Sequence, residues 1–273
     1  MKASVIVAVY KDVRALELIF ESLSYQTYKN FEVVVAEDGQ DEHMAVCVAN
    51  AKEMHDFEIK HTTQEDKGVR KSRSQNNGIL ASEGEYLIFI DGDCVLYSTF
   101  IDGHVALAKP KQVLSGRRLN LDEKISLRLR NKVITPLEVE KKLLTRFIYL
   151  AFNKEVKYEQ GIYIRPHSFL FGLINKNRNT AILGCNFSVW KKDIVDINGF
   201  DEGYGGTAVS DDTDLDWRFR GIGLQVASCK NAANMFHLWH KINARESDTS
   251  ALLRLKENQK KGLYVCNKGL NTH

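Results

Sequence analysis

The chain has 273 residues, of which 44% are hydrophobic, so it can bury a core of domain size and is not expected to be disordered. Its 38 Lys and Arg residues against 35 Asp and Glu residues give a formal net charge of +3, which is too close to balance for a surface that binds nucleic acid throughout. Five cysteines without C-x-x-C spacing predict neither a disulfide framework nor a zinc site, and without a run of about 18 apolar residues no membrane span is predicted.

Strands and helices are predicted to alternate along the first third of the chain. Short β-branched runs at Ser4–Val9 and Phe31–Ala36 predict two strands. Between them, after the good N-cap residue Asp12, apolar residues recur at helical spacing: Val13, Leu16, Phe20 and Leu23. The same rhythm continues with a helix at 44–54, a strand at 57–61, a helix at 70–81 and a strand at Tyr86–Ile90. Such alternation predicts an α/β fold with a mostly parallel sheet covered by helices.

The rest of the chain is less regular, and its charge is uneven. Residues 109–178 hold 16 Lys and Arg residues against 6 Asp and Glu residues, so this middle segment is basic although the whole chain is near neutrality. A strand-like run at 181–189, a glycine-rich loop at 199–206 and an acid-rich helix start at 210–216 follow it. No repeat, low-complexity tract or interdomain linker is apparent.

Acidic residues stand where two of the predicted strands end. Asp38 follows the second strand, and Asp91 and Asp93 follow the strand at 86–90 with only Gly92 between them. Residues i and i+2 of an extended segment point the same way, so the two carboxylates can face one small volume, which Gly92 lets a ligand approach. Carboxylate oxygens suit Mg²⁺ or Mn²⁺, either of which could bridge a diphosphate. The alternative is a solvated turn, because Asp-Gly is a common turn dipeptide.

Four sequence blocks carry a resemblance to a known family. They are VIVAVYKD, SLSYQTYKNFEVVVAEDG, EDKGVRKSRSQNNGILASEGEYLIFIDGDC and GCNFSVWKKDIVDINGFDEGYGGTAVSDDTDLDWRFRGIG. In order and spacing they resemble the family 2 inverting glycosyltransferases, which have the GT-A fold, and in particular the subgroup with a galactosyltransferase-like C-terminal region. The blocks cover roughly three fifths of the chain, and several blocks in the right order are more specific than one short motif.

The resemblance implies one GT-A domain, a Rossmann-like α/β unit with a mostly parallel mixed sheet. Residues 1–108 would form its nucleotide-sugar-binding half, 109–180 a basic, partly helical insertion on the acceptor side, 181–245 the acceptor and catalytic half, and 246–273 a C-terminal helical tail.

The resemblance also implies roles for residues on the donor side. Asp38 and the backbone around Ala8 and Tyr10 would hold uridine, and Asp91 would bind the ribose or a metal-bound water. The remaining donor contacts would come from Gly68, Arg70 and Arg73 near uracil and diphosphate, from Gly92, and from Gly184 and Asn186 near the sugar. Alternatives without a ligand stay open for some of these positions: core packing for residues 5–9 and a strand-end turn for Asp38. Lys67, Lys71 and Arg73 could form an ordinary solvated helix face, which we favour for Lys71.

A divalent metal, Mn²⁺ or Mg²⁺, is implied as the cofactor. Asp93 would ligate it directly, Asp91 would assist, and His237 would complete the site with His240 close behind. The alternative for either histidine is a structural or solvated side chain.

An inverting transfer needs a carboxylate that takes the proton of the acceptor hydroxyl. Asp212 is the candidate base, and Asp211 stands beside it where the family usually has Glu. The alternative is an ordinary helix start, because Ser210 is a good N-cap and acids suit a first helical turn. Tyr204 in the glycine-rich loop is expected to stack on a pyranose ring.

The function expected from the resemblance is transfer of a sugar from a UDP-sugar to a hydroxyl of a surface glycan or lipid-linked saccharide, of the lipopolysaccharide or capsule kind. The N-terminal apolar stretch is too short for a signal peptide, so we expect a cytoplasmic protein, peripheral on the inner face of the cell membrane if the acceptor is lipid-linked.

Two interpretations of the basic segment stay open. The amphipathic run Lys141–Phe152 either packs on its own domain or rests on an anionic membrane, and an anionic glycolipid acceptor could bind Arg117, Arg118, Arg128 and Arg130.

Other functional classes are also considered. A sugar nucleotidyltransferase would need a glycine-rich phosphate loop after the first strand, where residues 9–13 contain no glycine. A non-catalytic module that binds sugar nucleotides or glycans is the third candidate. A nucleic-acid partner is not expected, because the basic residues lack interleaved aromatic residues.

Overall fold

The computed structural model describes residues 1–145, 161–175, 178, 180–205, 207, 209, 212–241 and 249–272. Its first part alternates strands and helices: β1 (Ala3–Val9), α1 (Val13–Ser24), β2 (Phe31–Glu37), α2 (Glu42–Met54), β3 (Glu58–Thr62), α3 (Lys71–Ala81) and β4 (Tyr86–Asp91). These bounds agree with the elements predicted from the sequence to within about two residues.

The later part contains shorter elements. They are β5 (Cys94–Leu96), α4 (Phe100–Leu107), β6 (Gln112–Ser115), β7 (Leu119–Asn120), α5 (Glu123–Arg130), α6 (Pro136–Thr145), α8 (Phe169–Asn175), β8 (Asn186–Trp190), α9 (Lys191–Asp196), the 3₁₀ turn η2 (Glu202–Tyr204), α10 (Thr213–Gly221), β9 (Gln225–Ser228), β10 (Met235–His237), α11 (Thr249–Lys261) and the 3₁₀ turn η3 (Leu270–Thr272).

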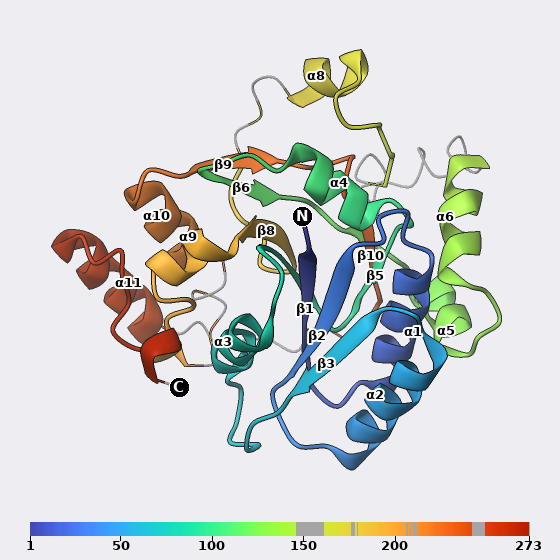
Figure 1. Ribbon diagram of the computed structural model, residues 1–273, viewed down its shortest axis with the longest axis horizontal. Helices are drawn as coiled ribbons and strands as arrows, with labels where there is room; N and C mark the ends of the chain where they lie inside the picture. Colours follow the sequence, from blue (N-terminus) through green and yellow to red (C-terminus); the bar gives the residue numbers. More distant parts are fainter. Residues whose placement is uncertain are drawn as a thin grey trace.

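Seven strands form the central sheet in the order β3-β2-β1-β4-β8-β6-β9 (Figure 1). Strands β3, β2, β1 and β4 are parallel, β8 is antiparallel to β4 and β6, and β9 is parallel to β6. The predicted α/β fold with a mostly parallel sheet is therefore confirmed. The chain order reverses at β1, between β2 and β4, and ligands of open α/β sheets bind beside such a reversal at the carboxyl ends of the strands.

The sheet is buried on both faces because its strands are apolar at successive positions. In β1, Val5 and Val7 join the core cluster under α1 and α2, whereas Ile6 joins the cluster under α3, α9 and α10. Helices α1 and α3 lie on opposite sides of the sheet (Figure 1). Successive residues of a strand face opposite ways, so a run without polar interruptions is what a two-sided sheet requires.

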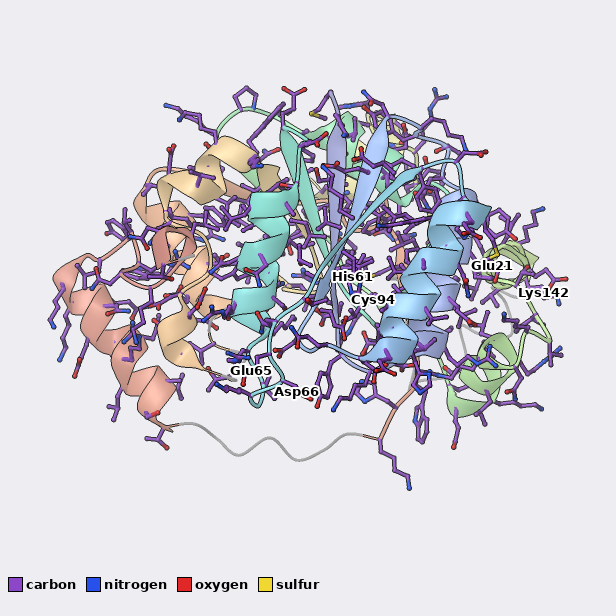
Figure 2. The ribbon with its side chains drawn as sticks, turned by 60° about the horizontal axis from the view of Figure 1, so that its bottom comes forward. Glu21, His61, Glu65, Asp66, Cys94 and Lys142 are labelled. Atoms are coloured by element: carbon purple, nitrogen blue, oxygen red, sulfur yellow. The ribbon has the colours of Figure 1, made fainter. Side chains whose placement is uncertain are left out.

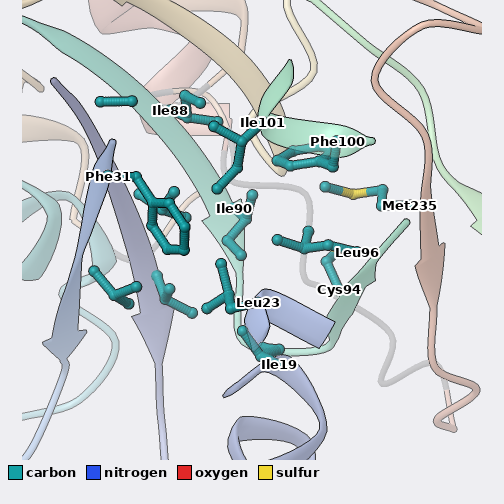
Figure 3. Packing of buried hydrophobic residues seen from close by; sticks show 14 of the residues in the cluster. Ile19, Leu23, Phe31, Ile88, Ile90, Cys94, Leu96, Phe100, Ile101 and Met235 are labelled. Carbon is teal, nitrogen blue, oxygen red and sulfur yellow. The ribbon is translucent and has the colours of Figure 1, made fainter. Parts of the chain in front are cut away.

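The larger core cluster joins the sheet to elements from the rest of the chain. Figure 3 shows its side chains between α1, β4, β5 and α4, including Ile19, Leu23, Ile90, Phe100 and Met235. The predicted N-cap of α1 is confirmed, since the Asp12 side chain accepts a hydrogen bond from the Ala15 backbone nitrogen.

A second, three-stranded sheet in the order β5-β10-β7 lies beside the end of β4. In this sheet His237 of β10 pairs with Cys94 of the antiparallel β5 and with Asn120 of the parallel β7. The Leu238 backbone nitrogen donates to the Asp93 carbonyl at 2.9 Å. Residues 235–238 are thereby held against the Asp-Gly-Asp turn after β4.

Two segments differ from the sequence prediction. The strand expected over 181–189 begins only at Asn186, because the Asn186 backbone nitrogen bonds the Leu183 carbonyl at 2.8 Å and closes a turn. The helix expected from Lys141 begins earlier, at Pro136, and the part of it beyond Thr145 lies outside the described residues. In the described part, Val139 and Leu143 pack on the protein's own core.

Helix α8 stands apart from the sheet (Figure 1) and exposes most of its apolar side chains. Phe169 is 84% exposed, and Leu170, Leu173 and Ile174 are exposed as well, whereas Phe171 is buried in the core cluster. No helix in the described ranges combines the length and apolar character needed to cross a membrane.

Candidate active site

A cavity of about 580 Å³ opens where β1, β2 and β4 end. The predicted site residues that line it are Ala8, Tyr10, Asp38, Gly68, Asp91, Gly92, Asp93 and His240. The structure therefore brings most of the predicted donor and metal residues to one place.

Strand register explains why these residues meet. Ala8 pairs with Asp91 in the ladder of β1 and β4, and the Asp38 backbone nitrogen donates to the Val9 carbonyl at 3.0 Å. Gly92 is required by the fold itself, since a Cβ atom there would lie 2.9 Å from the Ala8 carbonyl oxygen. The turn between Asp91 and Asp93 therefore packs directly on the end of β1.

The Asp38 carboxylate is buried and organises the loop before α3. Its two oxygens accept hydrogen bonds from the Gln64 side chain and the Arg70 backbone nitrogen, both at 2.6 Å. The loop itself turns at Gly68, whose φ of +71° belongs to the left-handed region that glycine enters without strain.

The rim of this loop also contacts the end of β1. Asp66 accepts a hydrogen bond from the Tyr10 hydroxyl at 3.3 Å and lies 2.8 Å from the Lys11 ammonium. Figure 2 shows Asp66 and Glu65 at the tip of the loop, at the edge of the sheet. Tyr10 is held over the cavity in this way, although its ring is half exposed.

The two predicted arginines of this region do not line the cavity. The Arg70 guanidinium donates to the Glu65 carbonyl and so stabilises the loop. Arg73 points to the exposed side of α3. Their predicted contacts with the nucleotide stay predictions.

Asp93, His237 and His240 form a compact group at one end of the cavity. One carboxylate oxygen and two imidazole nitrogens lie within 4.8 Å of one another. Asp93 Oδ2 is 3.1 Å from His237 Nε2 and 3.4 Å from His240 Nε2. The pairing of β10 with β5 places His237 here, which explains how two residues so far apart in the sequence meet.

The Asp93 carboxylate remains ionised despite its burial. Burial by itself raises its pKa, but the hydrogen bond and charge of His237, the hydrogen bond from the Cys94 thiol and the charge of Arg118 lower the pKa to about 2. A carboxylate and two imidazoles fit a divalent transition ion such as Mn²⁺ better than Mg²⁺, which prefers an all-oxygen shell.

Asp91 lies outside this group of three and pairs with a lysine instead. Its Oδ1 atom is 2.6 Å from the ammonium of Lys71, which lines the cavity together with Ser74. We favoured a solvated helix face for Lys71, and the structure corrects this. The glycine at position 78 could have indicated this from the sequence, because it lies on the same face of α3 as Lys71 and Ser74. A Cβ atom at Gly78 would lie 2.7 Å from Ile6 Cγ2, so this face packs on β1.

The candidate base Asp212 is tied to the segment before β8. Its Oδ1 atom accepts a hydrogen bond from the Gly184 backbone nitrogen. Asp212 occupies the N-cap position of α10, yet its side chain makes no capping hydrogen bond, so the helix-start alternative does not account for its orientation. Asp211 lies outside the described residues.

A short series of contacts links Asp212 to the group of Asp93, His237 and His240. Gly184 is followed by Cys185, whose sulfur accepts a hydrogen bond from Arg118 at 3.5 Å. The pKa of the Cys94 thiol is raised well above its usual value by a hydrogen bond with Cys185 and by burial, so the two thiols are in contact next to Asp93. Asp212, the candidate base, and Asp93, a candidate metal ligand, therefore both lie next to the same pair of buried cysteines.

Two predicted sugar contacts are not brought into the cavity. Asn186 is fully buried, and its side-chain amide donates to the Arg117 and Ala233 carbonyls at 2.9 and 3.1 Å, so it joins the segment after β6 to the segment before β10. The stacking role expected of Tyr204 is wrong, because its ring is 3% exposed and is covered by the Arg254 guanidinium.

Asp12 and Arg130 also line the cavity, which the sequence did not indicate. Asp12 was predicted only as a helix cap and Arg130 only as a possible contact of an anionic acceptor. The Arg130 guanidinium lies on Asp12 with two hydrogen bonds of 2.8 Å.

A second acidic group at the opposite edge of the sheet is structural. Glu32, Glu58 and Glu83 could hold a cation by their spacing, but the ammonium groups of Lys2 and Lys60 already lie 2.7 to 3.4 Å from their oxygens. This network neutralises the buried Glu32 without a metal.

Comparisons with known proteins identify the family and the fold. The family model described as Glycosyl transferase family 2 matches residues 4–172. Glycosyltransferase GlyG of Streptococcus pneumoniae serotype 4 (strain ATCC BAA-334 / TIGR4) is 29% identical over 122 residues, which are 44% of this chain and 40% of GlyG. The matched part therefore spans less than half the length of that relative.

Two solved structures have a similar fold at 15% identity and a TM-score of 0.57. One is the mannosyltransferase PcManGT from Pyrobaculum calidifontis in complex with GDP-Man and Mn²⁺, for which the match covers 93% of this chain and 60% of that one. The other is S. aureus TarS 1-349 in complex with UDP-GlcNAc, for which the match covers 100% of this chain and 69% of that one. The family match extends over more than half of the 273 residues, so the chain belongs to glycosyl transferase family 2, and its sheet has the expected GT-A fold.

Proposed function

We propose that this protein is a metal-dependent, inverting glycosyltransferase that moves a sugar from a UDP-sugar to a hydroxyl of a surface glycan or lipid-linked saccharide. The observation that carries this proposal is that Asp38, Asp93 and His240 line one cavity at the carboxyl edge of the sheet. Family membership supports sugar transfer, and the similar structures with UDP-GlcNAc and with GDP-Man support a sugar-nucleotide donor. The choice of UDP rests on the resemblance of the sequence blocks around Asp38.

The nucleoside is proposed to lie over the end of β1. Asp38 holds the loop that carries Gly68, and both residues face the cavity together with the backbone of Ala8. An ionised carboxylate accepts strong hydrogen bonds from the N–H groups of a base. Tyr10, held by Asp66, provides a flat apolar surface beside it.

The cation is proposed to bind between Asp93, His237 and His240. When bound, it would neutralise the charge that develops on the departing nucleotide diphosphate. Asp93 supplies the ionised oxygen, and its pKa of about 2 keeps it ionised throughout the physiological range. Lys71, paired with Asp91, offers a positive charge to the phosphates from α3.

The transfer step is proposed to use Asp212 as the base. The acceptor oxygen attacks the anomeric carbon, the bond from that carbon to the phosphate oxygen breaks with its electron pair leaving on UDP, and Asp212 takes the acceptor proton. The hydrogen bond from the Gly184 backbone nitrogen orients the Asp212 carboxylate. The contacts through Cys185 and Cys94 support this role, because they keep Asp212 on the same side of the sheet as Asp93.

The acceptor is proposed to approach from the basic segment. Arg118 lies beside Cys185, between the two halves of the site, and its neighbour Arg117 is partly exposed. A glycan or glycolipid that carries phosphate or carboxylate groups suits such residues. A lipid-linked acceptor would bring the protein to the inner face of the cell membrane, and sedimentation with anionic and neutral vesicles tests that step. Equal binding to both, or to neither, would contradict it.

The main experiment is a donor screen by thermal shift. UDP, GDP, CDP and dTDP sugars are tested with and without Mn²⁺, since a specific ligand stabilises the fold by mass action. We expect UDP-sugars with Mn²⁺ to raise the melting temperature most. Indifference to every nucleotide would contradict the donor-site assignment.

Product analysis then separates the rival functions. Free UDP released with transfer to an acceptor supports the glycosyltransferase, whereas pyrophosphate would identify a nucleotidyltransferase. Slow release of UDP from the donor in the presence of Mn²⁺, abolished by Asp93→Ala, excludes a module that only binds. Asp196→Ala, which changes an exposed carboxylate of α9, is the matched control.

A further inference from the structure

Helix α5 carries two arginines that differ sharply in their surroundings. Arg130 is 22% exposed in its side chain, and its two terminal nitrogens donate to the two oxygens of Asp12, each at 2.8 Å. Arg128, two residues earlier on the same helix, is exposed and lines a separate groove of about 100 Å³ with Leu121 and Leu143. The two side chains therefore offer a matched pair of the same charge and the same helix.

The Arg130–Asp12 pair belongs to the wall of the donor cavity. Both residues line it together with Asp93 and His240. The pKa of the Arg130 guanidinium is raised by its hydrogen bond with Asp12 and by the charges of Asp12 and Asp93. Arg130 therefore also interacts electrostatically with Asp93, the proposed metal ligand. Arg130 stands at the last turn of α5, where the helix dipole favours a cation.

Three of the four carboxylates that line this cavity have a basic side chain as partner, and the fourth, Asp38, accepts hydrogen bonds from Gln64 and the Arg70 backbone nitrogen. Asp91 has Lys71, Asp93 has two imidazoles, and Asp12 has Arg130. A divalent cation that enters with a nucleotide would take Asp93, and the accompanying diphosphate brings negative oxygens that need cations of their own. A planar guanidinium suits them, because it donates to two phosphate oxygens in the same forked geometry that it shows on Asp12.

A purely structural role accounts poorly for this pair. Asp12 is 43% exposed in its side chain, and ion pairs of such exposure contribute only about 0 to 1 kcal/mol to stability. Asp12 already serves the fold as the cap of α1, a task that needs only its Oδ1 atom and the Ala15 nitrogen.

We propose that Arg130 binds the diphosphate of the sugar nucleotide, leaving Asp12 for the phosphate oxygens when the donor enters. The inference rests on the proposed function, since it assumes a nucleotide donor in this cavity. In this role Arg130 positions the diphosphate and neutralises part of its charge. It belongs to the basic segment 109–180, which resembles the family least. Asp12 holds the guanidinium at the wall of the cavity that Asp93 also lines.

The test compares UDP with uridine by calorimetry in the presence of Mn²⁺, on the whole protein. We expect Arg130→Ala to weaken UDP binding by about 10- to 100-fold and to leave uridine within about 2-fold, because a lost charged hydrogen-bond pair affects only the phosphates. Arg128→Ala, the matched control, should leave both affinities unchanged. Arg130→Lys should fall between wild type and Arg130→Ala, because it keeps the charge and loses the fork.

Asp12→Asn separates a phosphate contact from a structural pair. Asn is as good an N-cap as Asp, so α1 keeps its cap, while Arg130 loses its ionic partner. UDP affinity equal to or above that of wild type supports the proposal. A loss of UDP affinity as large as in Arg130→Ala would overturn it, because the pair would then act only by shaping the cavity.

The remaining outcomes are equally decisive. Arg130→Ala and Arg128→Ala with the same UDP affinity overturn the role of Arg130 and leave the proposed function standing. Equal losses for UDP and uridine in Arg130→Ala also overturn it, since they indicate a disturbed fold. A wild-type protein that binds neither UDP nor uridine with Mn²⁺ contradicts the proposed function and this inference together.

Discussion

Residues 1–108, the proposed donor half of the molecule, and the later segments contribute to the cavity in different ways. Strands β1 and β2 are buried at every position, and even the charged Glu32 is enclosed there. By contrast, α8 leaves Phe169 84% exposed, and α5 reaches the cavity with a single arginine. The difference teaches that the sheet fixes the position of the cavity, whereas side chains from surface elements complete its wall.

The largest effect is expected on kcat, from Asp212, the proposed base in the later part of the chain. We expect Asp212→Asn to lower kcat by about 10²- to 10⁴-fold, the usual contribution of a general base, and to leave UDP affinity within about 2-fold. Asn is isosteric and still accepts the hydrogen bond from the Gly184 nitrogen, so the local fold is kept. Steady-state kinetics and UDP calorimetry measure the two quantities.

Asp196→Asn is the control for this change, because Asp196 pairs only at the surface with Lys192. Its kcat should stay near that of wild type. An Asp212→Asn protein that keeps full kcat would show that another group takes the acceptor proton.

The second largest effect is expected on the free energy of unfolding, from the buried carboxylate of Glu32 in β2. Burial raises the pKa of Glu32, but hydrogen bonds from Ser4, the Glu83 backbone nitrogen, Lys60 and Lys2 lower it to about 2, below its value of 4.5 in the unfolded chain. A carboxylate with a lowered pKa stabilises the fold above pH 4.5 and loses that contribution as the pH falls toward 2. We expect Glu32→Gln to cost about 3 kcal/mol at pH 7 and progressively less below pH 4.5.

Urea unfolding at several pH values measures this cost. Glu58→Gln, which changes a half-exposed member of the same network, should cost much less at pH 7. A Glu32→Gln penalty that stays constant from pH 7 to pH 3 would mean that packing, and not the charge, stabilises this edge.

The smallest effects compare one glycine in each region. A Cβ atom at Gly78 of α3 would lie 2.7 Å from the buried Ile6 side chain, whereas nothing lies within 4 Å of a Cβ atom at Gly172 of α8. We expect Gly78→Ala to destabilise by about 1 to 3 kcal/mol through overpacking. Gly172→Ala should stabilise by about 0.5 to 1 kcal/mol through helix propensity. Equal shifts in thermal unfolding would contradict the contrast between a packed and a free helix face.

Local patterns in the sequence predicted the donor half well. The β-branched runs predicted β1 and β2, Asp12 predicted the start of α1, and the Asp-Gly-Asp turn predicted a polar end to β4. These features depend on neighbours in the sequence, so periodicity and turn chemistry are enough to find them.

The parts that the sequence did not reveal depend on packing between distant elements. The docking of α5 on α1 decides that Arg130 meets Asp12, which no local pattern predicts. The resemblance did place His237 with Asp93, but only the pairing of β10 with β5 shows how they meet. Asn186 and Tyr204 were interpreted as ligand contacts because they lie in blocks that resemble the family. Instead, the buried Asn186 amide donates to the Arg117 and Ala233 carbonyls, and the Arg254 guanidinium covers the Tyr204 ring.

The central claim is that Asp93 and its two histidines hold a cation that binds a nucleotide diphosphate in this cavity. Calorimetric titration of UDP into the wild-type protein and Asp93→Asn, each with and without Mn²⁺, tests it most directly. We predict that Mn²⁺ strengthens UDP binding to the wild type by at least about 10-fold and has no effect on Asp93→Asn, because one ligand and its charge are gone. UDP binding to the wild type that is indifferent to Mn²⁺, or an equal effect of Mn²⁺ on both proteins, would contradict the claim.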